Sequence, residues 1–481
     1  KRMTCKWCCV LVLCLAWTLR ETHGARAAQP HVVIIMVDDL GYGDLGCYNP
    51  DSRIPTPHID RIAAAGMRFT DAHAAGPLCH MSRYGLLTGR YPFRIDVSRW
   101  PTEPLIQDGE TTIASLAAAH GYQTAMVGKW HLGFRERGYD RPLTGGPVDR
   151  GFATFFGIRA STDIPPYFYI AQDRAVRPPT ELIQANSSPD WSPIQGVFWR
   201  AGGIAPGLKL SAVLPRFTQE AVDIIQQHAA RKATQPLFLY LAFPAPHTPW
   251  LPADEFLGKS GAGLYGDFAA MVDAHVGRVV QTLADAHMLD ETLLIVTSDN
   301  GPVWYASDAA KFGHDSVAGL RGMKGDAWEG GHRMPFLVRW PGHVTPGSVT
   351  ESLIGFTDVL ATLADVLGVQ LSAGTGPDSI SFLPVLRGKT VGADLRTSWA
   401  MQTANKTNVV RVGNWKLIDR LGSGGFSKPS RVEPSTGDPA GQLYDLASDP
   451  DESENVYAMY PEVVAQLRGQ LQQIQNGADL E

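Results

Sequence analysis

Five short runs of aliphatic and β-branched residues constrain the fold of this chain more than any other feature. The runs are continuous rather than alternating, which is typical of strands buried on both faces of a parallel sheet. They predict strands at residues 31–37, 123–127, 237–243, 292–297 and 336–340.

Helical patterns lie between these runs, with apolar residues three and four positions apart or with capping residues at their ends. They predict helices at residues 57–66, 111–120, 217–230, 267–289 and 357–367. Strands that alternate with helices predict an α/β fold class, with a large, mostly parallel sheet sandwiched by helices.

Two regions interrupt this alternation. Residues 142–214 are rich in Pro, Gly, Ser and aromatic residues without a clear period, so we expect irregular excursions over the sheet edge. A second break lies near 371–377, followed by expected short strands at 408–418 and 442–446 and a closing helix at 461–475. We therefore expect a main α/β domain at residues 28–372 and a smaller C-terminal α+β subdomain at residues 373–481.

Two of the expected strands end in carboxylate and amide side chains. Asp38 and Asp39 follow the first run, and Asp299 and Asn300 follow the fourth. Parallel strands would bring both pairs to the carboxyl edge of the sheet, where ligands bind. Three carboxylates there would repel one another by about 1 kcal/mol per pair at 4 Å in water. These oxygen ligands predict a hard divalent cation, Ca²⁺ or Mg²⁺; the alternative is a capped loop and a simple Asn-Gly turn.

The run from Pro77 to Arg90 reads PLCHMSRYGLLTGR. It resembles the sulfatase signature, Cys-x-Pro-x-Arg followed by Leu-Thr-Gly-Arg, and departs from it at Met81, where the family has Pro or Ala. In that family a maturation enzyme oxidises the cysteine to formylglycine, whose hydrated aldehyde is the nucleophile. The resemblance implies this role for Cys79, with Arg83 one helical turn away to orient it. The alternative is a small buried thiol.

Other motifs match the same family in order along the chain: GKWHLG at 128–133, PHTP at 246–249, RGMKG at 321–325 and WEGG at 328–331. By resemblance, Arg83, Lys129 and Lys324 hold the sulfate together with the cation. His247, with Lys324, protonates the departing oxygen, and His131 takes a proton from the second hydroxyl of the nucleophile.

Further predictions for the site rest on position in these loops, with loop packing as the alternative for each. Seven residues are expected to contact substrate: Ser161, His314, Arg321, Trp328, Glu329, His332 and Arg333. The resemblance also implies that Asp38, Asp39, Asp299, Asn300 and a hydroxyl of modified Cys79 bind the metal, Ca²⁺ in preference to Mg²⁺.

The resemblance runs from residue 32 to Asn455, where QLYDL at 442–446 is similar to the C-terminal signature of sulfatases. It implies an alkaline-phosphatase-like fold and an arylsulfatase-type enzyme, a sulfuric ester hydrolase that cleaves sulfated carbohydrates or aryl sulfates. Two alternatives stay open: a phosphonate or phosphate ester hydrolase of the same fold, and a non-catalytic carbohydrate-binding relative with unmodified Cys79.

The first 27 residues have the pattern of a signal peptide. A basic start precedes an apolar stretch at 7–19, too short for the roughly 20 residues that span a bilayer, and Ala25-Arg26-Ala27 forms a cleavage site. We expect export to the periplasm or the medium, and no membrane association after cleavage. Without this segment, which holds five basic residues and one acidic residue, the formal charge of −6 becomes −10.

The acidity of the remaining chain argues against a nucleic-acid partner. A sulfated substrate must therefore meet a local basic cluster. Only Cys47 and Cys79 remain after residue 27, so they form one disulfide or, if Cys79 is modified, none.

Overall fold

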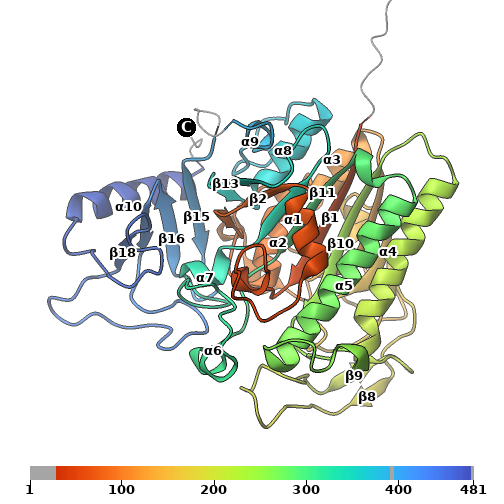
Figure 1. The fold of residues 1–481 in the computed structure, drawn as a ribbon, viewed down its shortest axis with the longest axis horizontal. Coiled ribbons are helices and arrows are strands. Elements are labelled where there is room, and N and C mark those ends of the chain that lie inside the picture. The colour runs from red at the N-terminus through yellow and green to blue at the C-terminus, as the bar shows by residue number, and fades with distance from the viewer. Residues whose placement is uncertain (1–28, 390–394, 478–481) are drawn as a thin grey trace, which may run out of the picture.

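A computed structural model describes residues 29–389 and 395–477. Its centre is a mixed sheet of ten strands with helices on both faces (Figure 1). In spatial order the strands are β13 (Ser348–Thr350), β2 (Met67–Phe69), β12 (Phe336–Arg339), β11 (Thr292–Ser298), β1 (His31–Asp38), β10 (Leu237–Pro246), β4 (Gln123–Lys129), β5 (Thr154–Ile158), β6 (Ile170–Ala171) and β7 (Arg174–Ala175).

The middle of the sheet is parallel, as the continuous apolar runs predicted. β1 pairs in parallel with β10 on one side and with β11 on the other. The register sets Val37 opposite Ser298, so the residues that follow, Asp38 and Asp299, emerge side by side at one edge. This confirms the common edge on which the metal-site prediction depends.

Alternate residues of β1 belong to two hydrophobic cores, one on each face of the sheet. Val32, Ile34 and Met36 pack toward α2, α3, α8 and α9, whereas Val33 and Ile35 pack toward α1, α4 and α5. The helices of the main domain are α1 (Pro57–Ala64), α2 (Cys79–Thr88), α3 (Ile113–Ala119), α4 (Val213–Ala230), α5 (Gly263–Asp285), α6 (Ala306–Phe312), α7 (Glu329–His332), α8 (Asp358–Leu367) and α9 (Leu383–Leu386).

Two expectations about the sheet are wrong. The run at 336–340 forms β12, but this strand is antiparallel to β11, with Phe336 opposite Thr297. β12 begins at the same end of the sheet at which β11 finishes, so it runs in the opposite direction to β11. The region 142–214 is also less irregular than expected, because β5 joins the sheet parallel to β4; the other short strands there include β8 (Glu181–Ile183) and β9 (Gly202–Ile204).

A second sheet of four antiparallel strands forms the C-terminal part of the fold, at the left of Figure 1. It consists of β15 (Ser398–Gln402), β16 (Asn408–Val412), β17 (Trp415–Ile418) and β18 (Gln442–Asp445), covered by α10 (Pro461–Gln475). Leu467 and Leu471 of α10 share a separate core with these strands. A two-stranded parallel pair, β3 (Ala72–His73) and β14 (Ile354–Gly355), lies in the main domain.

The predicted signal peptide at residues 1–27 lies outside the described residues. Within 29–389 and 395–477, no helix combines the length and the apolar character that crossing a bilayer needs. Cys47 and Cys79 are both free thiols, so the disulfide alternative is not realised.

Candidate active site

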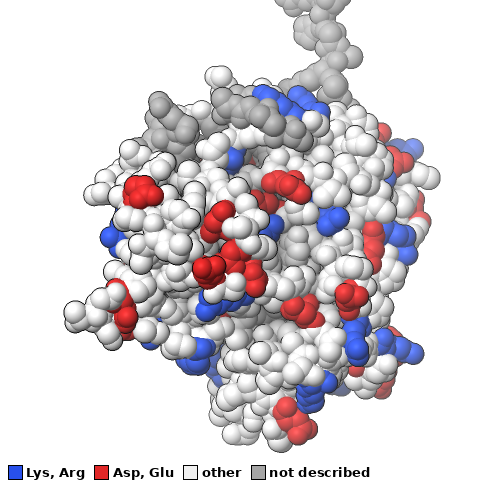
Figure 2. Space-filling model, turned by 60° about the vertical axis from the view of Figure 1, so that its left-hand side comes forward, with Lys and Arg blue, Asp and Glu red and all other residues white. Residues whose placement is uncertain are grey.

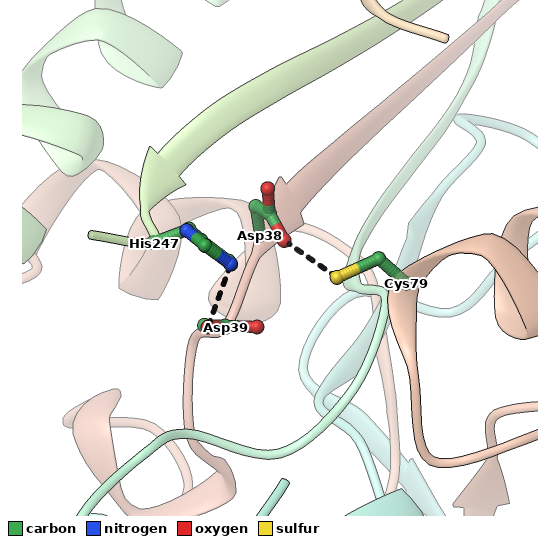
Figure 3. A group of neighbouring side chains, drawn as sticks. All are labelled: Asp38, Asp39, Cys79 and His247. Atoms are coloured by element: carbon green, nitrogen blue, oxygen red, sulfur yellow. Dashed lines mark hydrogen bonds and ion pairs between the residues drawn. The ribbon is translucent and has the colours of Figure 1, made fainter. Parts of the chain in front are cut away.

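Four buried side chains from separate parts of the sequence meet at the carboxyl edge of the sheet (Figure 3). Asp38 ends β1, Asp39 follows it, Cys79 begins α2 and His247 follows β10. One ligand atom of each lies within 4.8 Å of those of the other three. We refer to these four residues as the Asp38 cluster.

The Cys79 sulfur lies between a carboxylate and a lysine ammonium group at this edge. Its Sγ is 3.3 Å from Asp38 Oδ1 and 3.3 Å from Lys324 Nζ. Burial raises the pKa of the thiol well above its ordinary value, and the negative charges of Asp299 and Asp38 add to this effect. The unmodified thiol is therefore protonated and a poor nucleophile.

Three buried cations face the three carboxylates of the edge. Arg83 Nε donates to Asp299 Oδ2 at 2.9 Å, Lys324 Nζ donates to Asp39 Oδ1 at 2.5 Å, and Lys129 Nζ donates to Asp38. Arg83 also donates to the Lys129 carbonyl at 2.8 Å, which ties α2 to β4. The formal charges of these groups cancel, so a bound divalent cation would leave positive charge for an anionic substrate.

Arg83, Lys129 and Lys324 form the local basic cluster that a sulfated substrate needs on an acidic protein. Figure 2 shows acidic and basic side chains interspersed over one face of the molecule, without a broad basic surface there. The positive charge of the site comes instead from Arg83, Lys129 and Lys324, all of which are buried.

The oxygen atoms of this edge fit a hard divalent cation. Asn300 Oδ1 is buried and has no hydrogen-bond partner among the described residues, while Nδ2 of the same side chain donates to Asp39 at 2.6 Å. Burial and the neighbouring Asp38 raise the pKa of Asp299 to about 6. A cation shared by Asp38, Asp39, Asp299 and Asn300 would relieve this crowding, and carboxylate and amide oxygens suit Ca²⁺ or Mg²⁺.

Two histidines at this site differ in their surroundings, His247 in the cluster and His131 beside it. His247 Nδ1 lies 2.7 Å from the Thr248 carbonyl, which can only accept, so Nδ1 carries a hydrogen. Its Nε2 lies 3.7 Å from Asp39 Oδ2 and is the atom that can gain or release a proton. Burial and Lys129 hold the pKa of His131 well below its ordinary value, so His131 is a neutral base.

His131 has a different backbone conformation from the strand that it follows. Its φ of 60° is left-handed, so the alternation along β4 ends before it. Its side chain still lines the same cavity as Cys79, and its ring packs 4.5 Å from that of Trp100.

A cavity of about 180 Å³ opens above the cluster. Besides Cys79, Asp39, His131, His247 and Lys324, it is lined by residues that the sequence did not single out, among them His80, Trp100, Asp163, Arg200, Tyr265 and Phe426. His80 follows Cys79 directly and Asp163 follows Ser161 by two positions, so the motifs could have indicated both. Phe426 comes from the C-terminal part of the chain, and no sequence signal connects it with the others.

Of the seven predicted substrate contacts, the structure brings only Ser161 into the cavity. Its Oγ is buried without a hydrogen-bond partner within the described part of the chain. Arg321 lies instead over the Trp328 ring, at 3.8 Å, and donates to the Glu452 carbonyl at 2.5 Å. Arg321 and Trp328, both predicted to contact substrate, therefore pack against the C-terminal strands.

Four other residues predicted to contact substrate also have protein partners and do not line this cavity: Glu329, His332, Arg333 and His314. Glu329 accepts from Lys416 Nζ at 2.9 Å, and His332 lies 3.0 Å from His73. Arg333 donates to the Thr70 carbonyl at 2.7 Å, and His314 lies 2.8 Å from Asp44.

Comparisons with known proteins agree with this geometry. The Sulfatase family model matches residues 30–369. An N-acetylgalactosamine-6-O-sulfatase of Bacteroides thetaiotaomicron is 33% identical over 95% of both chains, and human arylsulfatase A is 34% identical over 92% of this chain and 87% of its own.

Solved structures show the same fold. One from work on the metabolism of multiple glycosaminoglycans by Bacteroides thetaiotaomicron has a TM-score of 0.81 at 32% identity and covers 94% of this chain and all of its own. Another, in complex with a neocarrahexaose, has a TM-score of 0.72 at 23% identity and covers 94% of both chains. With a family model over most of its length and full-length relatives at one third identity, this chain belongs to the sulfatase family.

Proposed function

We propose that this protein hydrolyses sulfate monoesters of saccharides, with formylglycine made from Cys79 as nucleophile and Ca²⁺ held by Asp38, Asp39, Asp299 and Asn300. One observation carries the proposal: Cys79 Sγ lies 3.3 Å from both Asp38 and Lys324, between the ion site and a buried cation, at the wall of the cavity. An oxygen at this position would be held by both.

The two absent groups would supply distinct chemistry. Bound Ca²⁺ would neutralise negative charge on the sulfate, and formylglycine would supply a hydrated aldehyde with one hydroxyl for attack on sulfur and a second for release of sulfate. The protein's own cations complete the electrostatic environment, because Arg83, Lys129 and Lys324 are buried and already fixed by hydrogen bonds. Preorganised charge of this kind stabilises the transition state.

The two histidines divide the proton transfers. When the bond between sulfur and the alcohol oxygen breaks, that oxygen needs a proton, and His247 Nε2 is the atom able to deliver one. His131 is neutral and lines the cavity beside residue 79, so it accepts the proton of the second hydroxyl. General acid and base steps each contribute about 10²–10⁴-fold to such reactions.

Unsatisfied polar atoms favour a saccharide over an aryl group as the alcohol. Asp163 Oδ1 and Ser161 Oγ are buried in the cavity wall without a hydrogen-bond partner among the described residues. Asp163 Oδ1 lies 3.9 Å from His247 Nδ1, and Arg200 pairs with the other oxygen of Asp163. Trp100 and Phe426 add flat apolar walls. Hydroxyl-binding groups beside aromatic faces suit a sugar ring, and the relatives include an N-acetylgalactosamine-6-O-sulfatase.

Export is part of the same proposal. The signal-peptide pattern at residues 1–27 supports it, since sulfated polysaccharides are too large to enter a cell intact. Secretion of an epitope-tagged full chain, followed by N-terminal sequencing, would test cleavage after Ala27.

Release of inorganic sulfate from a panel of sulfated saccharides tests the proposed activity. We expect release from at least one sulfated monosaccharide and, in parallel, faster hydrolysis of nitrophenyl sulfate than of nitrophenyl phosphate. Faster phosphate cleavage would favour the phosphate ester hydrolase. Binding of saccharides without any turnover, with a thiol at residue 79, would favour the binding relative.

Asp163→Asn separates the alcohol site from the sulfate site. The change keeps the size of the side chain but removes the charge that pairs with Arg200, so we expect about 10-fold lower kcat/KM on the preferred saccharide. Nitrophenyl sulfate, which lacks sugar hydroxyls, should lose much less. Equal losses on both substrates would refute this assignment.

A further inference from the structure

We propose that Tyr265, Asp44 and His314 form a clamp that fixes the orientation of Asp39 in the metal site. They are positioning residues, because they act on the reaction through Asp39. The inference rests on the proposed function, in which Asp39 binds Ca²⁺.

Asp39 has a backbone conformation that residues other than glycine rarely adopt. Its φ is 65°, in the left-handed region, directly after β1 ends. Such strain persists where the surrounding structure over-determines it. The turn aims the carboxylate at Lys324 and Asn300, so the metal site depends on holding this turn.

The Tyr265 hydroxyl contacts this turn at the backbone carbonyl of Asp39. Its single hydrogen is shared between two acceptors, the Asp44 carboxylate and the Asp39 carbonyl oxygen, which lies 3.1 Å from the hydroxyl oxygen. Tyr265 is in the first turn of α5 and is buried, with its ring 5.3 Å from that of Trp250 and 5.1 Å from that of Trp304. Packing between two aromatic rings leaves the hydroxyl one position, which connects the turn to α5.

Asp44 in turn is fixed by partners on both of its oxygens. Oδ2 accepts from the Gly41 amide at 2.6 Å as well as from Tyr265. Oδ1 accepts from Ser316 Oγ at 2.6 Å and from His314 Nε2 at 2.8 Å. The carboxylate is fully buried and therefore holds the tyrosine hydroxyl in place.

The hydrogen bonds of His314 determine its tautomer. The Arg53 amide donates to Nδ1 at 3.3 Å, so Nδ1 is an acceptor and the hydrogen of the neutral ring is on Nε2, pointing at Asp44. Both ring nitrogens are thus used within the protein. This explains why His314, predicted to contact substrate, acts at a distance from it.

Backbone contact makes the clamp rigid. A Cβ at Gly41 would lie 2.0 Å from the Ser316 carbonyl oxygen, and one at Gly43 would lie 2.2 Å from that of Asp315. The Gly43 amide also donates to the Ser316 carbonyl at 2.8 Å. The loop that follows Asp39 therefore sits directly on the loop that carries His314.

Calcium titration of Tyr265→Phe tests the clamp. The change removes only the hydroxyl and keeps the packed ring. After removal of metal with a chelator, isothermal titration with CaCl₂ should give a Kd about 10-fold higher than that of the wild type, as for other groups that orient metal ligands. Tyr48→Phe is the matched control: its buried hydroxyl donates to the Phe69 carbonyl at 2.8 Å and accepts from the Phe336 amide at 2.9 Å, and its loss should leave the Kd unchanged.

A second pair of variants serves if Tyr265→Phe folds poorly. His314→Gln keeps a donor for Asp44 and should bind Ca²⁺ within about 3-fold of the wild type, whereas His314→Ala should bind about 10-fold more weakly. Equal Kd values for the wild type, Tyr265→Phe and His314→Ala would overturn the clamp and leave the proposed function intact. Absence of Ca²⁺ binding by the wild type would overturn both.

Discussion

Two buried groups of acidic and histidine side chains have similar composition but opposite surroundings. The first is the Asp38 cluster, and the second consists of His73, Glu329 and His332, here called the His73 cluster. In each, the possible ligand atoms lie within 4.8 Å of one another. The comparison shows what distinguishes a reactive site from a structural one.

The His73 cluster has filled its own hydrogen-bonding capacity. His73 Nε2 lies 2.8 Å from Asp71, and the two histidines face each other at 3.0 Å through their Nδ1 atoms. His332 Nε2 then lies 3.1 Å from Lys416 Nζ, which also donates to Glu329 at 2.9 Å. The lysine ammonium thus takes the place that a metal ion would have.

The positions of the two clusters differ as well. Lys416 is on β17, and Trp399 of β15 packs 4.8 Å from both histidine rings, so the His73 cluster joins the main domain to the C-terminal sheet. The Asp38 cluster instead opens on the cavity, and the neighbouring Asn300 Oδ1 has no hydrogen-bond partner within residues 29–389 and 395–477. An acceptor left free beside a cavity indicates a functional site, whereas polar groups that all have partners at an interface indicate a structural one.

Cys79→Ala tests the first half of this contrast and should have the largest effect. Removal of the nucleophile should lower kcat on nitrophenyl sulfate by about 10⁴-fold or more. The fold should survive, because the loss is a single small side chain. Thermal unfolding by circular dichroism provides the control, and a variant with substantial activity would contradict the assignment of residue 79.

Asp299→Asn should remove the metal. We expect Ca²⁺ affinity and activity to fall together by about 10³-fold, because one carboxylate ligand is replaced by a neutral amide. Glu329→Gln is the matched variant in the His73 cluster, and it should leave the Ca²⁺ affinity unchanged. Metal loss in Glu329→Gln but not in Asp299→Asn would reverse the comparison.

Lys416→Met should affect stability and leave the chemistry intact. It leaves Glu329 and Glu452, which lies 2.8 Å from Lys416 Nζ, without their shared cation. Breaking a buried ion pair in this way costs about 3 kcal/mol or more. Urea unfolding measures the loss, and calcium titration of the folded variant should match the wild type. An unchanged free energy of unfolding would show that the cluster does not hold the two parts together.

Acid should destabilise the protein moderately through the same cluster. Burial lowers the pKa of His73 and of His332, so each is neutral when folded, while the unfolded chain takes up both protons as the pH falls below about 6.5. Burial raises the pKa of Glu452 to about 7, so below pH 7 the folded protein binds a proton there that the unfolded chain does not bind. This proton offsets one of the two that the histidines of the unfolded chain take up. One extra proton in the unfolded state lowers stability by about 1 kcal/mol per pH unit.

Urea unfolding at pH 7 and pH 5 measures this slope. The double variant His73→Leu/His332→Leu should lose less stability on acidification than the wild type. In this double variant Lys416 keeps its partner Glu329, and Asp71 keeps its partner Arg411. Equal slopes for both proteins would place the acid sensitivity elsewhere.

The sequence predicted the parts of the fold that local pattern determines. The strands that became β1 and β11 are continuous aliphatic runs, and the acidic residues at their ends fall at one edge as expected. Strand direction has no such signal, because a buried antiparallel strand such as β12 has the same composition as a parallel one. β5 was missed because five residues that include Gly157 give too short a pattern.

The site shows the same division. Asp38, Cys79 and Lys324 were predicted from motifs. Glu329 lies in a motif of the same quality and His332 directly follows it, but both belong to the other cluster. Neighbours in a loop point in different directions, and only the packing of the C-terminal strands decides which ones reach the cavity. Tyr265 and Asp44, which hold Asp39, carry no chemical signature of their own in the sequence.

If the proposed function is right, residue 79, at the Asp38 cluster, is an aldehyde in the active enzyme. Mass spectrometry of the peptide that contains residue 79, from protein made in its native host and treated with a hydrazide, tests this most directly. We expect the hydrazone of formylglycine in place of the thiol, in spite of Met81. A protein that cleaves sulfate esters at full rate with an intact Cys79 thiol would contradict it.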